Sequence, residues 1–197
     1  PGCAVVPAAL AMAEREGSTG AQFLKAVTVG YDICARMGMA LGGEAFIRTG
    51  KDSHAVAGAM GAAAAAGALS GLDPVRIGYA LSYASQQASG LATLFRDHGH
   101  VEKAFVFGGL PARSGIAAVT MVQSGMTGVP DPLDGTPNFF SANNAQGDVI
   151  GAFRNLGRPH EIARTNIKRW SVGSPAQAVL DALEALIVRH KIKAADV

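Results

Sequence analysis

Apolar side chains recur every three to four residues through most of the segment 1–125. This spacing predicts a series of amphipathic α-helices, each with one apolar stripe. Polar capping residues, glycines and prolines mark the ends of the segments. The predicted helices are 7–16, a segment from Thr19 to the Gly42-Gly43 pair, a segment that opens at His54, one from Pro74 to Ser89-Gly90, and one from near Lys103 to Gly125. Helices joined by short, glycine-marked turns are typical of an all-α bundle.

The segment 55–67 is built almost wholly of Ala and Gly. Small side chains let neighbouring helices approach closely on every side, so this helix is predicted to be buried at the centre of the bundle. Asp52 or Ser53 is expected to cap its N-terminus. A membrane span is the alternative, which we disfavour because Ala and Gly contribute little transfer free energy and a span needs about 20 apolar residues.

The pattern changes in the last third of the chain. Residues 128–144 are rich in Pro, Asp, Asn and Gly and predict a long loop anchored by Phe139-Phe140. After a weak helix near 148–156, the segment 167–172 is interpreted as a strand. Ser174-Pro175-Ala176-Gln177 predicts a helix start, with Ser as N-cap and Gln completing a capping box.

One strand and one helix do not form a sheet by themselves. The chain also opens on Pro1-Gly2-Cys3, without an initiator methionine. We therefore expect an internal fragment of a longer polypeptide, incomplete at both ends.

The composition of the chain disfavours several classes of function. A formal charge of +2 without a basic run gives no indication of nucleic-acid or membrane-surface binding. Cys3 and Cys34 have neither metal-ligand nor disulfide-framework spacing, and reduced thiols favour a cytoplasmic protein. His98 and His100 lack a third ligand nearby, so a solvated loop is preferred to a metal site. No cofactor or metal is predicted.

Three residues with suitable chemistry lie at the edges of predicted elements: His54, Lys103 and Lys168. His54 falls in the first turn of the central helix, where the positive end of the helix dipole favours the neutral imidazole. A neutral imidazole can accept a proton. Taken singly, each residue is more commonly a structural or surface residue, and a lone histidine at a helix start is usually structural.

Considered together, several motifs carry a resemblance to a known family. They are the run from His54 to Ala66, Gly71-Leu72-Asp73, Ala80-Leu81, the segment 84–90, Lys103 ahead of Gly108-Gly109, and Ile167-Lys168-Arg169-Trp170 ahead of a capped helix. In this order they resemble the MmgE/PrpD family, which includes 2-methylcitrate dehydratase, cis-aconitate decarboxylase and iminodisuccinate epimerase. The resemblance implies a mainly α protein, with a helical domain over 1–163 and the start of an α+β lid domain over 164–197.

The resemblance also implies a site. His54 matches the active-site histidine of the family, and Lys103 and Lys168 match its lysines. Family members usually carry a further histidine directly before the proline that corresponds to Pro1, and dehydratases and decarboxylases often have another histidine in the region that is 171–175 here. This chain has none in 171–175.

The expected activity is that of a cofactor-independent lyase, either a dehydratase or a decarboxylase, that acts on a small di- or tricarboxylate. The expected assembly is a homodimer. The alternatives are an epimerase or isomerase of the same fold, and a catalytically inactive, truncated helical module.

Overall fold

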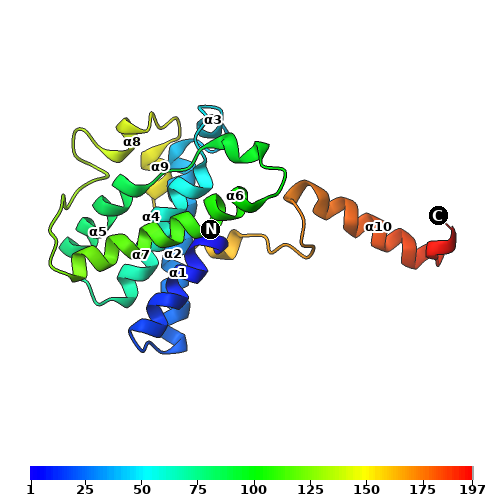
Figure 1. The fold of residues 1–197 in the computed structure, drawn as a ribbon, viewed down its shortest axis with the longest axis horizontal. Helices are drawn as coiled ribbons and strands as arrows, with labels where there is room; N and C mark the ends of the chain where they lie inside the picture. Colours follow the sequence, from blue (N-terminus) through cyan, green and yellow to red (C-terminus); the bar gives the residue numbers. More distant parts are fainter. Residues whose placement is uncertain (197) are drawn as a thin grey trace. The chain divides into compact units, whose positions relative to one another are not determined.

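A computed structural model describes residues 1–196 (Figure 1). The chain divides into two compact units, the first comprising residues 1–163 and the second beginning at Arg164. The helices of the first unit are α1 (Gly2–Arg15), α2 (Gly20–Leu41), α3 (Glu44–Ile47), α4 (Ser53–Leu69), α5 (Pro74–Gln87), η1 (Ala92–Arg96), α6 (Val101–Ala104), η2 (Phe105–Gly109), α7 (Leu110–Gln123), α8 (Phe139–Ala142) and α9 (Val149–Phe153). In the described residues the only β pairing is an isolated bridge between Lys51 and Leu91. The prediction of a mainly α protein is confirmed.

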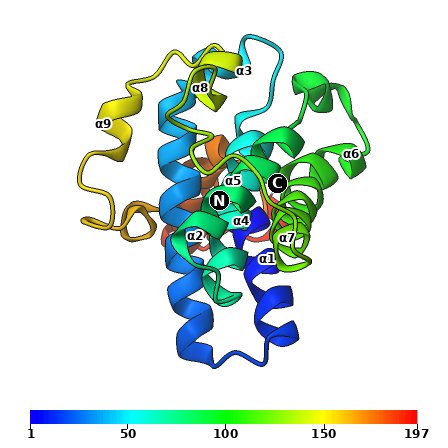
Figure 2. The ribbon, with the colours of Figure 1, turned by 90° about the vertical axis from the view of Figure 1, so that its left-hand side faces the viewer.

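Helix α4 is the centre of the first unit, as predicted. Every residue from 55 to 67 is buried. The helix packs against α1, α2, α5 and α7, and Figure 2 shows it between α2 and α7. Asp52 is the N-cap, and its side chain accepts a hydrogen bond from the Ala55 N–H. An Ala- and Gly-rich helix thus forms the core because neighbours can approach it on all sides.

Glycines permit close contacts of α4 with α2 and with α7. A Cβ atom on Gly30 of α2 would lie 2.5 Å from Val5 Cγ1 and 2.8 Å from the Gly61 carbonyl oxygen. A Cβ atom on Gly115 of α7 would lie 2.5 Å from the Ala63 backbone nitrogen. At such distances any side chain forces a shift of backbone, so these glycines set how closely α2 and α7 approach α4.

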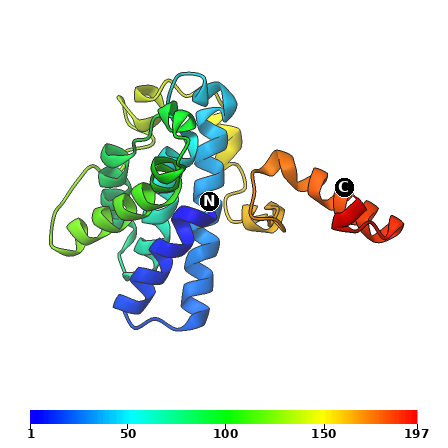
Figure 3. The ribbon, with the colours of Figure 1, turned by 45° about the vertical axis from the view of Figure 1, so that its right-hand side comes forward.

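Helices α1 and α2 lie side by side as a hairpin (Figure 3). The predicted capping box of Thr19 and Gln22 opens α2, and Gly42 in the left-handed conformation closes it. The predicted start of the first helix at Pro7 is wrong, because α1 begins at Gly2 and continues through Pro7. A proline in the second turn removes one backbone hydrogen bond, and here it lies on the exposed side of α1, away from the buried Ala4, Val5, Ala8 and Ala9.

The continuous helical run Val101–Gln123 is long and apolar enough to cross a membrane, judged by length and composition alone. Half of its most apolar stretch is buried inside the protein, as in the core helix of a bundle. Helix α4 is shorter than a span requires.

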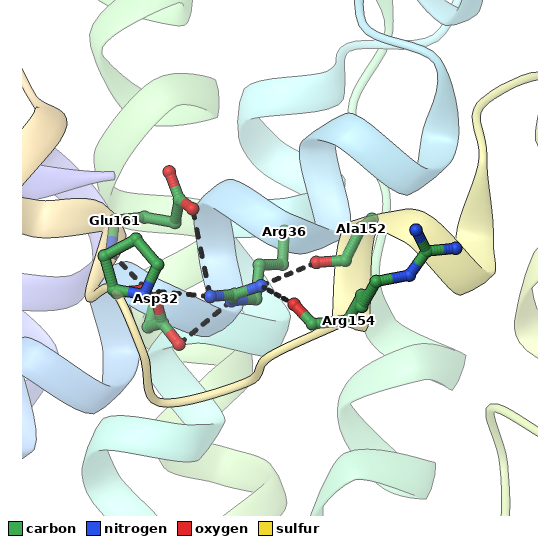
Figure 4. Close-up of polar contacts among 6 residues, drawn as sticks. Asp32, Arg36, Ala152, Arg154 and Glu161 are labelled. Carbon is green, nitrogen blue, oxygen red and sulfur yellow. Dashed lines mark hydrogen bonds and ion pairs between the residues drawn. The ribbon is translucent and has the colours of Figure 1, made fainter.

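A buried ion pair attaches the end of the first unit to α2 (Figure 4). Arg36 Nε donates to Asp32 Oδ2 at 3.0 Å, and both side chains are almost completely buried. The Glu161 N–H donates to Asp32 Oδ1 at 2.8 Å. The Arg36 guanidinium also donates to three backbone carbonyl oxygens, those of Ala152, Arg154 and Pro159. One arginine thereby satisfies three backbone carbonyl oxygens, one in α9 and two in the irregular segment after it.

The environment of Asp32 affects its ionisation. Burial by itself raises the pKa of this carboxyl, but the hydrogen bonds from the Glu161 N–H and from Arg36, together with the Arg36 charge, outweigh it. The net result is a pKa below the ordinary value of 3.8. Asp32 therefore remains ionised and paired at neutral pH.

The second unit consists mainly of η4 (Ser174–Ala176) and α10 (Gln177–His190), with η5 (Ala194–Asp196) after them; η3 (Glu161–Arg164) spans the boundary between the units. The predicted strand at 167–172 is wrong, since this segment is irregular. The predicted capping box at Ser174 is also wrong. Gln177 instead accepts a hydrogen bond from the Trp170 N–H and donates to the Trp170 and Val172 carbonyl oxygens. Whether this unit opens an α+β lid remains a prediction.

Candidate functional site

His54 is positioned by the way in which α4 starts. The Asp52 N–H donates to the Gly90 carbonyl oxygen at 2.9 Å, and the Ala92 N–H donates to the Gly50 carbonyl oxygen at 2.9 Å. Gly90 has a φ of +149°, and a Cβ there would lie 2.5 Å from Ala55 Cβ. The segment after α5 therefore fits against the first turn of α4 only because residue 90 is a glycine.

Asp52 and His54 form a pair across this first turn. The carboxylate is completely buried, whereas 52% of the His54 side chain is exposed. Asp52 Oδ1 accepts from the Ala55 N–H at 2.8 Å, and Oδ2 lies 3.3 Å from His54 Nδ1. The pair combines a fixed buried carboxylate with an accessible imidazole.

Phe107 brings His54 and Lys103 to one place. The rings of His54 and Phe107 have centroids 4.7 Å apart and are tilted by 31°. Lys103 Nζ lies 5.7 Å from the Phe107 centroid and 5.9 Å from that of Phe95. At these distances the ammonium group is attracted by the faces of both rings. An imidazole and a cation predicted from widely separated motifs thus contact the same aromatic side chain.

A π-helical turn places Phe107. In η2 the Leu110 N–H donates to the Phe105 carbonyl oxygen, five residues back. Pro111 has no N–H for the Phe107 carbonyl oxygen, which would be its partner in a regular helix. That oxygen instead accepts a hydrogen bond from Cys3 Sγ in α1, at 3.0 Å. Single π turns inside helices frequently occur at functional sites.

The loop before α6 is ordered by Asp97. Its carboxylate accepts hydrogen bonds from the Gly99 N–H at 3.0 Å and the Lys103 N–H at 3.3 Å. Desolvation acts to raise the pKa of Asp97, but these N–H groups, with that of Glu102 and the charge of His100, lower it overall. The predicted polar loop over 91–102 therefore contains local structure, η1 and the start of α6, that fixes the backbone of Lys103.

Lys168 belongs to the second unit, where its side chain is exposed beside Arg169. Arg169 packs on the Trp170 ring and pairs with Asp181 and Glu184 of α10. The placement of Lys168 in the same site as His54 remains a prediction.

Two residues of the site, Asp52 and Phe107, were not predicted to belong to it from the sequence. Asp52 was expected only as a possible N-cap. An aspartate two residues before a histidine at a helix start nevertheless indicates that the two side chains can form a hydrogen-bonded pair. Phe107 had no such signal, because its position depends on Cys3 and Pro111. Within residues 1–196, no three His, Cys, Asp or Glu side chains converge as a metal site would require.

A separate cavity of about 230 Å³ lies between α5 and the loop that precedes α8. Its lining is uncharged: Ser82, Ser85, Gln86, Val129, Pro132, Pro137, Asn138, Phe139, Ala142 and Asn143. A cavity without an ionisable side chain has no acid or base of its own, so this cavity does not supply the proton-transfer group that a lyase needs.

A comparison with models of protein families identifies the family of the chain. The family model of the MmgE/PrpD N-terminal domain matches residues 1–149. The chain therefore belongs to the MmgE/PrpD family. A comparison with curated proteins gives no match.

Proposed function

We propose that the protein is a cofactor-independent lyase of the MmgE/PrpD type that dehydrates or decarboxylates a small di- or tricarboxylate. The observation that carries the proposal is the contact of both His54 and Lys103 with Phe107, in a chain that belongs to this family. An exposed imidazole next to a cation is suited to proton transfer on an anionic substrate.

His54 is the proposed acid/base. In a dehydration its imidazole takes a proton from the carbon next to a carboxylate, and hydroxide leaves from the adjacent carbon. In the decarboxylation of an unsaturated acid, imidazolium gives a proton to carbon while CO₂ leaves. A positioned acid/base of this kind contributes about 10²- to 10⁴-fold in rate.

Lys103 and Lys168 are the proposed carboxylate-binding residues. A lysine ammonium is a compact positive charge that can bind a carboxylate and stabilise the enolate-like charge that develops beside it. Lys103 is supported by its position next to Phe107, and Lys168 by its motif. We also propose a cytoplasmic homodimer; the free thiols of Cys3 and Cys34 suit a reducing compartment.

The test is turnover of citrate, 2-methylcitrate, cis-aconitate and iminodisuccinate, with the products followed by NMR. We expect one of the first three to lose water or CO₂, and His54→Gln to reduce the rate by about 10²-fold or more. His160→Gln is the matched control, because His160 is an exposed histidine of the same unit. Interconversion of iminodisuccinate stereoisomers without loss of a group would indicate the epimerase instead. Equal turnover by His54→Gln would exclude the proposed role of His54.

A further inference from the structure

We infer that Asp52 is a positioning residue that holds the His54 ring with its proton on Nδ1 and with Nε2 free to exchange protons with a substrate. The inference deepens the proposed function and rests on it for the role of His54. It goes beyond helix capping, because the carboxylate uses its two oxygens for different purposes. One oxygen caps α4 and the other lies 3.3 Å from the imidazole.

The chemistry of the two groups determines the tautomer. An ionised carboxylate only accepts hydrogen bonds, so a neutral imidazole beside it must present an N–H. Nδ1 is the ring nitrogen next to Asp52 Oδ2. The proton of the neutral ring is therefore held on Nδ1, and the lone pair is on Nε2. A general base needs that lone pair on the side of the ring that faces the substrate.

The orientation of the Asp52 carboxylate is fixed by its surroundings. Asp52 is completely buried, its N–H is bound by the Gly90 carbonyl oxygen, and Oδ1 is bound by the Ala55 N–H. A carboxylate held in this way imposes its geometry on the half-exposed histidine.

Phe107 restricts the remaining freedom of the histidine. Its ring lies against the face of the imidazole, with centroids 4.7 Å apart. Asp52 thus fixes the ring edge that carries Nδ1, while Phe107 covers one face. Within residues 1–196, Asp52 is the hydrogen-bond partner of the His54 ring, and that bond engages Nδ1.

The competing explanation is that Asp52 serves only as an N-cap. Asp52→Asn separates the two. The amide oxygen still accepts from the Ala55 N–H, and Asn caps helices about as well as Asp. The amide NH₂ then faces Nδ1 as a donor, so the neutral ring must accept there and carry its proton on Nε2. Asp52→Asn therefore preserves the cap and reverses the tautomer.

The readout is the ¹⁵N spectrum of the His54 ring, recorded at a pH where the imidazole is neutral and assigned with His54→Gln. We expect a protonated Nδ1 and an unprotonated Nε2 in the wild-type protein, and the reverse in Asp52→Asn. Lyase turnover should fall by about 10²-fold or more in kcat with little change in KM, since the base is lost and binding is retained.

A wild-type ring that carries its proton on Nε2 would overturn the inference, and this measurement does not require Asp52→Asn to fold. An unchanged tautomer in a folded Asp52→Asn protein would overturn it as well. The predicted pair of spectra from a protein that turns over none of the carboxylates would support the positioning role and contradict only the proposed lyase activity.

Discussion

Gly30 and Gly61 lie against each other where α2 crosses α4, each next to the carbonyl oxygen of the other. A Cβ on Gly30 would lie 2.8 Å from the Gly61 oxygen, and a Cβ on Gly61 would lie 2.7 Å from the Gly30 oxygen. The two backbones are therefore in direct contact. This crossing holds α4, whose first turn carries His54, against α2.

We expect Gly30→Ala to lower the free energy of unfolding by about 1 to 3 kcal/mol, because the added methyl group overpacks this contact. Gly38→Ala is the control in the same helix, where a Cβ would be 4.0 Å from its nearest neighbour, Ala57 Cβ. It should be neutral or stabilising by up to about 1 kcal/mol through helix propensity. Urea unfolding measures both, and equal effects would contradict the close contact.

The ion pair of Arg36 and Asp32 is expected to stabilise the first unit. Arg36→Met leaves the Asp32 carboxylate buried without its partner and should cost about 3 to 5 kcal/mol. Arg48 and Glu44 form a matched pair at the same i,i+4 spacing, but 68% of the Arg48 side chain is exposed. Arg48→Met should cost no more than about 0.5 kcal/mol. Similar losses in the two variants would show that burial of the first pair contributes nothing.

The stability of the protein should depend on the ionisation of Asp32. Because the folded-state pKa lies below the ordinary value of 3.8, ionisation stabilises the fold above that value. The contribution disappears as the pH falls through the lower, folded-state pKa. Urea midpoints between pH 6 and pH 3 should thus fall more steeply for the wild-type protein than for Asp32→Asn. Parallel curves would contradict the lowered pKa.

Lys103 is expected to contribute to substrate binding. Lys103→Met keeps an unbranched side chain but removes the charge, and should raise KM or lower kcat/KM by at least about tenfold. Lys25→Met, at an exposed position on α2, is the control and should leave both constants unchanged. Unaltered kinetics in Lys103→Met would remove this residue from the site.

Much of the helical unit can be predicted from the sequence, because its determinants are local. The Ala and Gly content of 55–67 indicates burial, and Thr19 with Gln22 marks a helix start that the structure confirms. The strand predicted at 167–172 was wrong for a non-local reason. Apolar and β-branched residues adopt a strand only when another strand pairs with them, and this segment is held by Gln177 instead.

Only part of the candidate site could be predicted from the sequence, because the rest depends on non-local contacts. The pair of Asp52 and His54 spans two residues and has a sequence signal. Phe107 reaches His54 through a π turn that depends on Pro111 and on Cys3, a residue 104 positions before it in the chain. Contacts at that separation have no periodic pattern, so no local reading of the sequence finds them.

Proton transfer by His54 can be measured directly as deuterium incorporation from D₂O at the carbon next to a substrate carboxylate. The wild-type protein should incorporate deuterium into the product or the recovered substrate, and His54→Gln should lose at least about 99% of that rate while His160→Gln retains it. Incorporation by His54→Gln at the wild-type rate would show that another group carries the proton, and would contradict the site proposed around His54, Phe107 and Lys103.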